Sequence, residues 1–349
     1  SRQSFSEFDR EVDRLCAGLL NLGIERGDHI AIWLPNISEW VLFFAACGRL
    51  GAVAVPVNTR YKLDEARYVI ERSDAKLLVM LPSMWRTDYL SMLAEMAPEI
   101  ENGDPRFLQL AAFPTLRNVV VITDKAPPGM IALAELMQDD ISAVAAAEAA
   151  VRPEDMLLIG YTSGTTGKPK GVMHNHGVIR QSEKVGLAMG AEPGGKILGH
   201  MPFYHSAGLF MAIIPAMSLG LALVPMLQWQ ADEALELIAR EQITAFGGVP
   251  THFYDLVAES KRSPIDTRAV RAAWIGGSSV MQETFKGIKE ALKLERLLCT
   301  YGMTENTIST SFSDWNDPDE VCCRNCAPIL SDCEVRIVDP ETLDELPPG

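Results

Sequence analysis

Unbroken apolar runs of strand length recur along this 349-residue chain, separated by stretches with helical periodicity. The first half contains HIAIW, AVAVPV, KLLVML and NVVVI, and the second contains KILG, LALVP, ITAFGG, RAAWIGG and RLLCTY. Strands that are apolar on both sides must be buried on both faces, which is typical of parallel sheets covered by helices. There are more runs than one ordinary sheet needs, so the sequence predicts an α/β fold with two sheets.

Two mixed segments, residues 81–114 and 126–154, are predicted to be the least ordered parts of the chain. The last stretch, DCEVRIVDPETLDELPPG, is predicted to form a strand followed by a turn at Asp339 and Pro340.

The segment Ala207–Gln230 carries no charge and is long enough to cross a bilayer. Pro215, Gly220 and Pro225 divide it, and basic flanks are missing. A buried helix followed by a buried strand therefore fits better, and we expect no membrane span.

The formal net charge of −15 argues against nucleic acid and anionic membranes as partners. Seven cysteines with uneven spacing do not suit a disulfide framework, and the cluster from Cys322 to Cys333 lacks a second CxxC arm for zinc. Reduced thiols and a charged first segment without a signal peptide predict a cytoplasmic protein.

The stretch YTSGTTGKPKGVMH, which begins at Tyr161, directly follows the apolar run MLLIG. Its glycines allow backbone amides to approach a ligand, and its hydroxyls and lysines add donors and positive charge. These residues are Ser163, Gly164, Thr165, Thr166, Gly167, Lys168, Lys170 and Gly171. Such a loop at the carboxyl end of a buried strand predicts a polyphosphate site.

Two other interpretations compete with this one. A P-loop would need glycine at position 162 and serine or threonine at 169, where the chain has Thr162 and Pro169. A flexible linker would not normally follow a buried strand or carry a proline between two lysines.

The run YTSGTTGKPKG resembles the phosphate-loop signature of the adenylate-forming superfamily: acyl-CoA synthetases, aryl-CoA ligases, luciferases and peptide-synthetase adenylation domains. YGMTE at Tyr301 matches the second signature of this superfamily, and GGSSV at Gly276 and MPFYHSAG at Met201 follow its order and spacing. The likeness extends from about Phe5 to Asp339, and within it the chain is closest to acyl-CoA ligases.

The resemblance implies a layered αβαβα domain with two largely parallel, helix-covered sheets and the start of a small β-barrel subdomain. We expect residues 1–326 to form the adenylate-forming core of two intertwined subdomains, and residues 327–349 to begin the β subdomain. The ribose-binding aspartate, the hinge and the C-terminal lid domain with its lysine are not in this sequence. The segment is therefore expected to hold substrates without running the full reaction efficiently alone.

The resemblance also implies a role for each motif. Glu305 would bind Mg²⁺, Thr304 the α-phosphate, Tyr301 the adenine, and Gly276 to Ser278 the adenine and acyl group. The implied nucleotide contacts are Thr162, Ser163, Gly164, Thr165, Thr166, Gly167, Lys168, Lys170, Gly276, Gly277, Ser278, Tyr301, Gly302 and Thr304. The implied catalytic residues are Thr166, Lys168, His205, Thr304 and Glu305.

His205 lies among apolar residues, where a histidine is more often a core residue than a catalyst. In the resembling enzymes this loop lines the acyl pocket. The stretches HSAGLFM, FGGVPTHF and GGSSV contain no acidic residue, so an uncharged apolar acid fits better than an amino acid or a diacid.

The function predicted is an ATP-dependent ligase that activates a fatty, alicyclic or aromatic acid and transfers it to coenzyme A, releasing AMP and pyrophosphate. Transfer to a carrier protein, or nucleotide binding without catalysis, are the alternatives. Its partners would be the acid and coenzyme A, with a homodimer left open.

Overall fold

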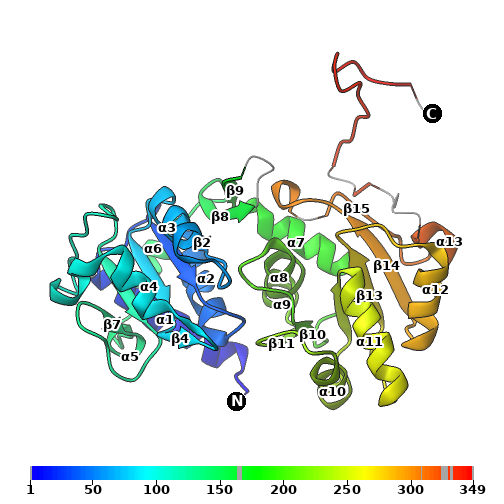
Figure 1. Cartoon of the computed structure of the whole chain (residues 1–349), viewed down its shortest axis with the longest axis horizontal. Helices are drawn as coiled ribbons and strands as arrows, with labels where there is room; N and C mark the ends of the chain where they lie inside the picture. Colours follow the sequence, from blue (N-terminus) through cyan, green and yellow to red (C-terminus); the bar gives the residue numbers. More distant parts are fainter. Residues whose placement is uncertain (1, 163–166, 308, 324–328, 331–332, 348–349) are drawn as a thin grey trace.

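The computed structural model describes residues 2–162, 167–307, 309–323, 329–330 and 333–347, and it contains two large sheets placed side by side (Figure 1). The first is seven-stranded, with the order β7-β6-β3-β1-β2-β8-β9. Neighbouring strands are parallel except for β8 and β9, which form an antiparallel pair at one edge. The strands are β1 (His29–Trp33), β2 (Val53–Pro56), β3 (Leu77–Met80), β6 (Asn118–Val121), β7 (Ile131–Ala132), β8 (Met156–Thr162) and β9 (Lys170–Asn175).

The second sheet is six-stranded, with the order β11-β10-β12-β13-β14-β15. It too is parallel except for its last pair, β14 and β15. The strands are β10 (Lys196–Gly199), β11 (Ala222–Pro225), β12 (Ala245–Gly248), β13 (Ala272–Gly276), β14 (Arg296–Tyr301) and β15 (Ser311–Phe312). The predicted α/β fold with two mainly parallel sheets is thus confirmed, because every apolar run became a strand of one of them.

Helices cover both faces of each sheet. On the first sheet, α1 (Phe5–Asn21) and α2 (Ser38–Leu50) pack on one face, and α3 (Leu63–Arg72) and α4 (Tyr89–Met96) pack on the other. On the second, the flanking helices are α10 (Ala231–Glu241), α11 (Pro250–Arg262) and α12 (Gln282–Ala291). Strands β1, β2, β3 and β6 are buried almost throughout, as their unbroken apolar sequences require.

Four helical segments lie between the two sheets (Figure 1). They are α7 (Gly177–Ala188), α8 (Ser206–Gly208), the π-helical turn η2 (Leu209–Ile213) and α9 (Ile214–Leu219). Phe210 and Ile213 pack into the core of the first sheet, whereas Met211 and Ala216 pack into the core of the second. A helix that is apolar all round is buried all round, which explains the charge-free run as far as Ala216. The buried strand predicted after it is wrong, because β11 lies at the sheet edge and its residues are exposed or partly exposed. No described helix is long and apolar enough to cross a membrane.

The two segments predicted to be least ordered contain regular elements, so that prediction was wrong. Residues 81–114 include the hairpin of β4 (Ser83–Met84) and β5 (Thr87–Asp88), helix α4 and the 3-10 turn η1 (Pro98–Asn102). Residues 126–154 include β7, α5 (Leu133–Leu136) and α6 (Val144–Ala149). These elements are short, and they are stabilised by tertiary packing rather than marked by a periodic sequence pattern.

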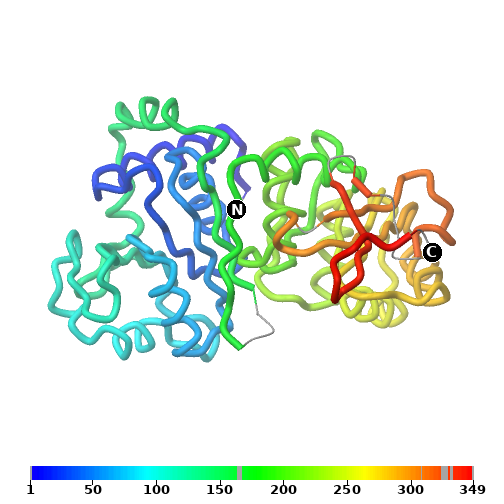
Figure 2. The backbone as a smooth tube through the Cα atoms, turned by 90° about the horizontal axis from the view of Figure 1, so that it is seen from above, coloured from blue at the N-terminus to red at the C-terminus, as the bar shows by residue number. Residues whose placement is uncertain are grey.

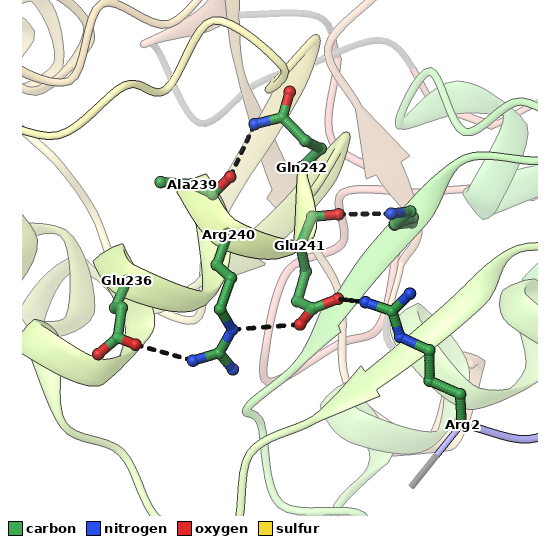
Figure 3. Close-up of polar contacts among 7 residues, drawn as sticks. Arg2, Glu236, Ala239, Arg240, Glu241 and Gln242 are labelled. Carbon is green, nitrogen blue, oxygen red and sulfur yellow. Dashed lines mark hydrogen bonds and ion pairs between the residues drawn. The ribbon is translucent and has the colours of Figure 1, made fainter.

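Both views place the N-terminus at the boundary between the halves (Figures 1 and 2). In Figure 3, Arg2 reaches across to Glu241 at the end of α10, with 2.9 Å between Arg2 Nη2 and Glu241 Oε2. Arg240 lies 3.2 Å from Glu241 and 2.7 Å from Glu236, and its hydrogen bond lowers the pKa of Glu241. Apart from Glu241, whose side chain is 18% exposed, these groups are largely exposed, so the network orients the N-terminal arm more than it stabilises the fold.

The C-terminal segment stands away from the rest of the chain (Figure 1). A single antiparallel bridge joins Val338 and Glu345, and the Leu346 N–H donates to the Ile337 carbonyl at 2.9 Å. The strand predicted for CEVRIVD is therefore not formed in the described residues, where the segment makes a narrow bend. The division at residue 326 lies outside the described residues and stays a prediction. A last short helix, α13 (Asp319–Cys322), precedes this segment.

One glycine of β12 makes a testable contact. A Cβ on Gly247 would lie 1.9 Å from the ring of Trp274 on β13, so the indole covers the backbone there. Gly247→Ala should destabilise the protein by about 1–3 kcal/mol through overpacking. Gly287→Ala is the matched control, because this exposed α12 position has no atom within 4 Å of an added Cβ; it should stabilise by about 0.5–1 kcal/mol. Chemical unfolding measures both, and equal effects would contradict this packing.

Candidate active site

The strands on either side of the glycine-rich loop, β8 and β9, form an antiparallel pair, and β8 has the parallel neighbour β2 on its other side. Strand β8 continues past the predicted MLLIG to Thr162 and pairs with β9, with Tyr161 opposite Gly171 and Thr162 opposite Lys170. The predicted phosphate contacts Ser163, Gly164, Thr165 and Thr166 lie outside the described residues. The sequence could not reveal the hairpin because β9 is mostly exposed and has no apolar run.

The remaining loop residues are placed around this turn. Gly167 has a φ of 93°, a left-handed conformation that favours glycine, and no atom of the described residues lies within 4 Å of the position an added Cβ would take. The Lys168 ammonium lies 5.2 Å from the ring centre of Tyr68 on α3, a cation–π contact. Lys170 begins β9 and is exposed. Both lysines are therefore at the surface beside the loop.

The YGMTE motif forms the corner between β14 and β15. Tyr301 is the last residue of β14 and is 55% exposed, so its ring is available to a flat ligand. Gly302 is partly buried, and the 3-10 turn η3 (Thr304–Asn306) follows. Within the turn, the Asn306 side chain accepts a hydrogen bond from the Met303 N–H at 3.0 Å. Glu305 points into solvent-accessible space and makes no ion pair with any described residue.

Thr304 brings the two motifs together. A Cβ on Gly160 in β8 would lie 3.6 Å from Thr304 Cγ2, so the threonine rests on the strand that leads into the phosphate loop. His174 of β9 bonds the Thr304 carbonyl through Nε2 at 2.7 Å, and Ser206 of α8 lies 3.0 Å from the Thr304 hydroxyl, Oγ to Oγ1. Motifs that are far apart in the sequence thus share one corner of the molecule.

The glycines of the GGSSV stretch lie at the carboxyl end of β13, beside the end of β14. A Cβ on Gly276 would lie 2.6 Å from Thr300 Cγ2 on the neighbouring strand, so this glycine is required by strand packing. Gly277 is exposed and has a φ of 82°, and Ser278 is exposed after it. The predicted ligand contacts of Gly276, Gly277 and Ser278 stay predictions.

His205 caps α8, because its Nδ1 accepts a hydrogen bond from the Ala207 N–H at 3.1 Å. In the neutral ring Nε2 therefore carries the proton. The side chain is exposed to solvent, and partial burial of its ring lowers its pKa. Its role in the reaction stays a prediction.

The loop before His205 is fixed by Asn36, which the sequence analysis missed. Asn36 is 6% exposed, and its Nδ2 donates to the Gly199 carbonyl at 3.1 Å and to the Met201 carbonyl at 2.9 Å. Its Oδ1 accepts from the Phe203 N–H at 2.8 Å. One buried amide from the first sheet thus sets the course of the loop that leaves the second, a pairing across the fold that no local pattern predicts.

A cluster of aromatic rings lies beyond the ends of β10 and β12. The ring centres of His200, Trp229 and His252 are 4.4–5.1 Å apart. Neither ring nitrogen of His200 has a hydrogen-bond partner among the described residues. Burial, and secondarily the nearby His252, lower the pKa of His200 to about 3. His200 is therefore neutral in the folded protein at neutral pH.

The AMP-binding enzyme family matches the chain over residues 1–349. The chain belongs to this family. The curated relatives include medium-chain acyl-CoA ligases ACSF2 of Danio rerio and Rattus norvegicus, which are 29% and 30% identical over 356 and 353 residues. These alignments cover 100% and 98% of this chain, and the chain spans only 59% and 57% of the length of these relatives. The predicted membership in the adenylate-forming superfamily, nearest to acyl-CoA ligases, is confirmed.

Solved structures agree on the fold. The anthranilate CoA ligase AuaEII in complex with anthranoyl-AMP superposes with a TM-score of 0.81 at 21% identity, over 99% of this chain and 62% of that protein. ATP-bound MatB from Rhodopseudomonas palustris gives 0.78 at 25% identity, over 99% of this chain and 63% of that protein. The first of these likenesses, at so low an identity, shows the fold alone.

The buried His200 predicts how stability depends on pH. Its folded-state pKa of about 3 is below the ordinary value of 6.5, so it contributes stability above pH 6.5 that is lost as the pH falls toward 3. Between pH 7.5 and 5 this loss should be about 2 kcal/mol. In His200→Phe, which keeps a ring in the cluster, the loss over that pH range should shrink by that amount. Urea unfolding at both pH values tests this, and identical pH dependence in the two proteins would refute it.

Proposed function

We propose that this chain forms the nucleotide- and acid-binding part of an ATP-dependent, AMP-forming acid–thiol ligase. The observation that carries the proposal is the hydrogen bond of 2.7 Å between His174 Nε2 on β9 and the Thr304 carbonyl, which joins the YGMTE turn to the hairpin beside the glycine-rich loop. A nucleotide with its base on Tyr301 would then have its phosphates directed past Thr304 toward Lys168. Membership in the AMP-binding family supports the same assignment.

The reaction proposed has two steps. A carboxylate oxygen of the acid attacks the α-phosphorus of ATP, and the bond to pyrophosphate breaks, which leaves an acyl-adenylate. The thiol sulfur of coenzyme A then attacks the acyl carbon, and AMP leaves with the bonding electron pair while the thiol loses its proton. The first step brings anions together, so hydrogen-bond donors and positive charge at the phosphates lower its barrier.

Glu305 fits the Mg²⁺ ion that such chemistry uses. Its carboxylate is exposed, makes no ion pair with a described residue, and follows directly after Thr304. Mg²⁺ binds few protein carboxylates and takes its other ligands from water and phosphate oxygens. When bound, the ion would neutralise phosphate charge.

The acid proposed is uncharged beyond its carboxylate: fatty, alicyclic or aromatic. Burial lowers the pKa of both His205 and His252, so these rings are neutral at pH 7. The stretches 205–211, 246–253 and 276–280 contain no other ionisable side chain. A second carboxylate or an ammonium group on the acid would therefore find no counter-charge there and would lose its hydration.

ATP–pyrophosphate exchange over a panel of carboxylic acids tests the proposal. We expect exchange with apolar monocarboxylic acids and little with amino acids or diacids, followed by thioester formation with free coenzyme A. Exchange without transfer to coenzyme A would instead favour loading of a carrier protein. ATP binding without exchange for any acid, even in the full-length gene product, would reduce the function to nucleotide binding.

Glu305→Gln tests the metal assignment. Removing the charge while keeping the shape should raise the Mg²⁺ concentration needed for half-maximal exchange about tenfold, because one charged ligand is lost. Glu101→Gln, at an exposed position of η1 in the first half, is the matched control and should leave the requirement unchanged. An unaltered Mg²⁺ titration for Glu305→Gln would rule out this role.

A further inference from the structure

Thr304 is held at both its hydroxyl and its carbonyl by side chains from two other segments of the chain. We propose that Ser206 and His174 are positioning residues that set the Thr304 hydroxyl to donate to a phosphate oxygen of the nucleotide. The inference rests on the proposed function, because it presupposes that a nucleotide phosphate reaches Thr304. His174 ends the stretch YTSGTTGKPKGVMH and Ser206 lies in MPFYHSAG, but the sequence predicted no role for either residue.

Ser206 controls the direction of the Thr304 proton. Ser206 is 8% exposed, and its Oγ has two polar neighbours: Thr304 Oγ1 at 3.0 Å and His205 Nδ1 at 3.5 Å. The imidazole nitrogen already accepts from the Ala207 N–H, so the serine proton is best donated to Thr304 Oγ1. The threonine oxygen is then an acceptor within the protein, and its own proton points toward the open side of the turn.

His174 fixes the backbone of the same turn. A carbonyl oxygen can only accept, so Nε2 of His174 carries a proton and donates it to the Thr304 carbonyl at 2.7 Å. The opposite side of the ring is also constrained, because it packs edge-on against the buried Phe210 at 5.2 Å between centres. The imidazole thus links the central helix η2 to the turn and leaves it little freedom to rotate.

Together these contacts locate Thr304 from three directions. Gly160 lies beneath its methyl group, Ser206 beside its hydroxyl and His174 at its carbonyl. Strands β8 and β9 flank the glycine-rich loop, and α8 follows the loop that carries His205. A preorganised hydroxyl does not have to reorient when the ligand binds. Its hydrogen bond to the phosphate therefore contributes more to the free energy of binding.

AMP and adenosine distinguish this role from a merely structural one, because only AMP has a phosphate. We propose to titrate the 349-residue chain with each compound and to monitor binding by NMR. Ser206→Ala should raise the Kd for AMP about tenfold, because about one hydrogen bond is lost. The Kd for adenosine should stay unchanged. Ser206→Thr keeps the hydroxyl and should bind AMP within about twofold of the unmodified chain.

His174→Phe keeps a ring against Phe210 but removes the donor, and should raise the Kd for AMP in the same selective way. His174→Gln retains an N–H and should restore part of the affinity. Ser182→Ala is the control, because this fully buried serine of α7 has no hydrogen-bond partner among the described residues. It should leave both affinities unchanged.

The outcomes separate the two proposals. If the unmodified chain binds AMP and Ser206→Ala and His174→Phe bind it equally well, the positioning role is wrong and the proposed function stands. If these variants weaken AMP and adenosine alike, the residues only maintain the fold and the inference is again overturned. If the unmodified chain binds neither compound, the proposed function fails, and the inference fails with it.

Discussion

The hydrogen bond between His174 Nε2 on β9 and the Thr304 carbonyl joins the two halves of this protein at the corner where their motifs meet. Each sheet has an antiparallel pair at one edge, β8 with β9 and β14 with β15. The corner of one pair carries the glycine-rich loop and the corner of the other carries Tyr301 and Glu305. A Cβ added at Gly160 would lie 3.6 Å from Thr304 Cγ2, an ordinary van der Waals distance, so the two corners are close neighbours.

The buried helices between the sheets hold the halves in this relation. Phe210 and Ile213 face the core of the first sheet, and Met211 and Ala216 face the core of the second. Asn36 adds a polar link from the first sheet to the loop before His205. The halves are therefore packed through a continuous apolar layer, which keeps the distances around Thr304 fixed.

The fold was predictable where burial imposes a pattern on the sequence. Strands such as β1, β3 and β13 lie inside parallel sheets, and their apolar runs predicted both their positions and the number of sheets. Strand β9 has polar, exposed residues, and β4, β5 and β7 are only two residues long, so nothing in their composition marks them. The motifs also predicted where a nucleotide site would be built. They did not predict His174, Ser206 or Asn36, because these act through contacts between residues far apart in the chain.

A crystal structure of the protein with a non-hydrolysable ATP analogue tests the central claim most directly. The account predicts the adenine against the ring of Tyr301, the α-phosphate at the Thr304 hydroxyl, and the outer phosphates at the turn between β8 and β9. A nucleotide bound elsewhere, or one that contacts only one of the two corners, would contradict it.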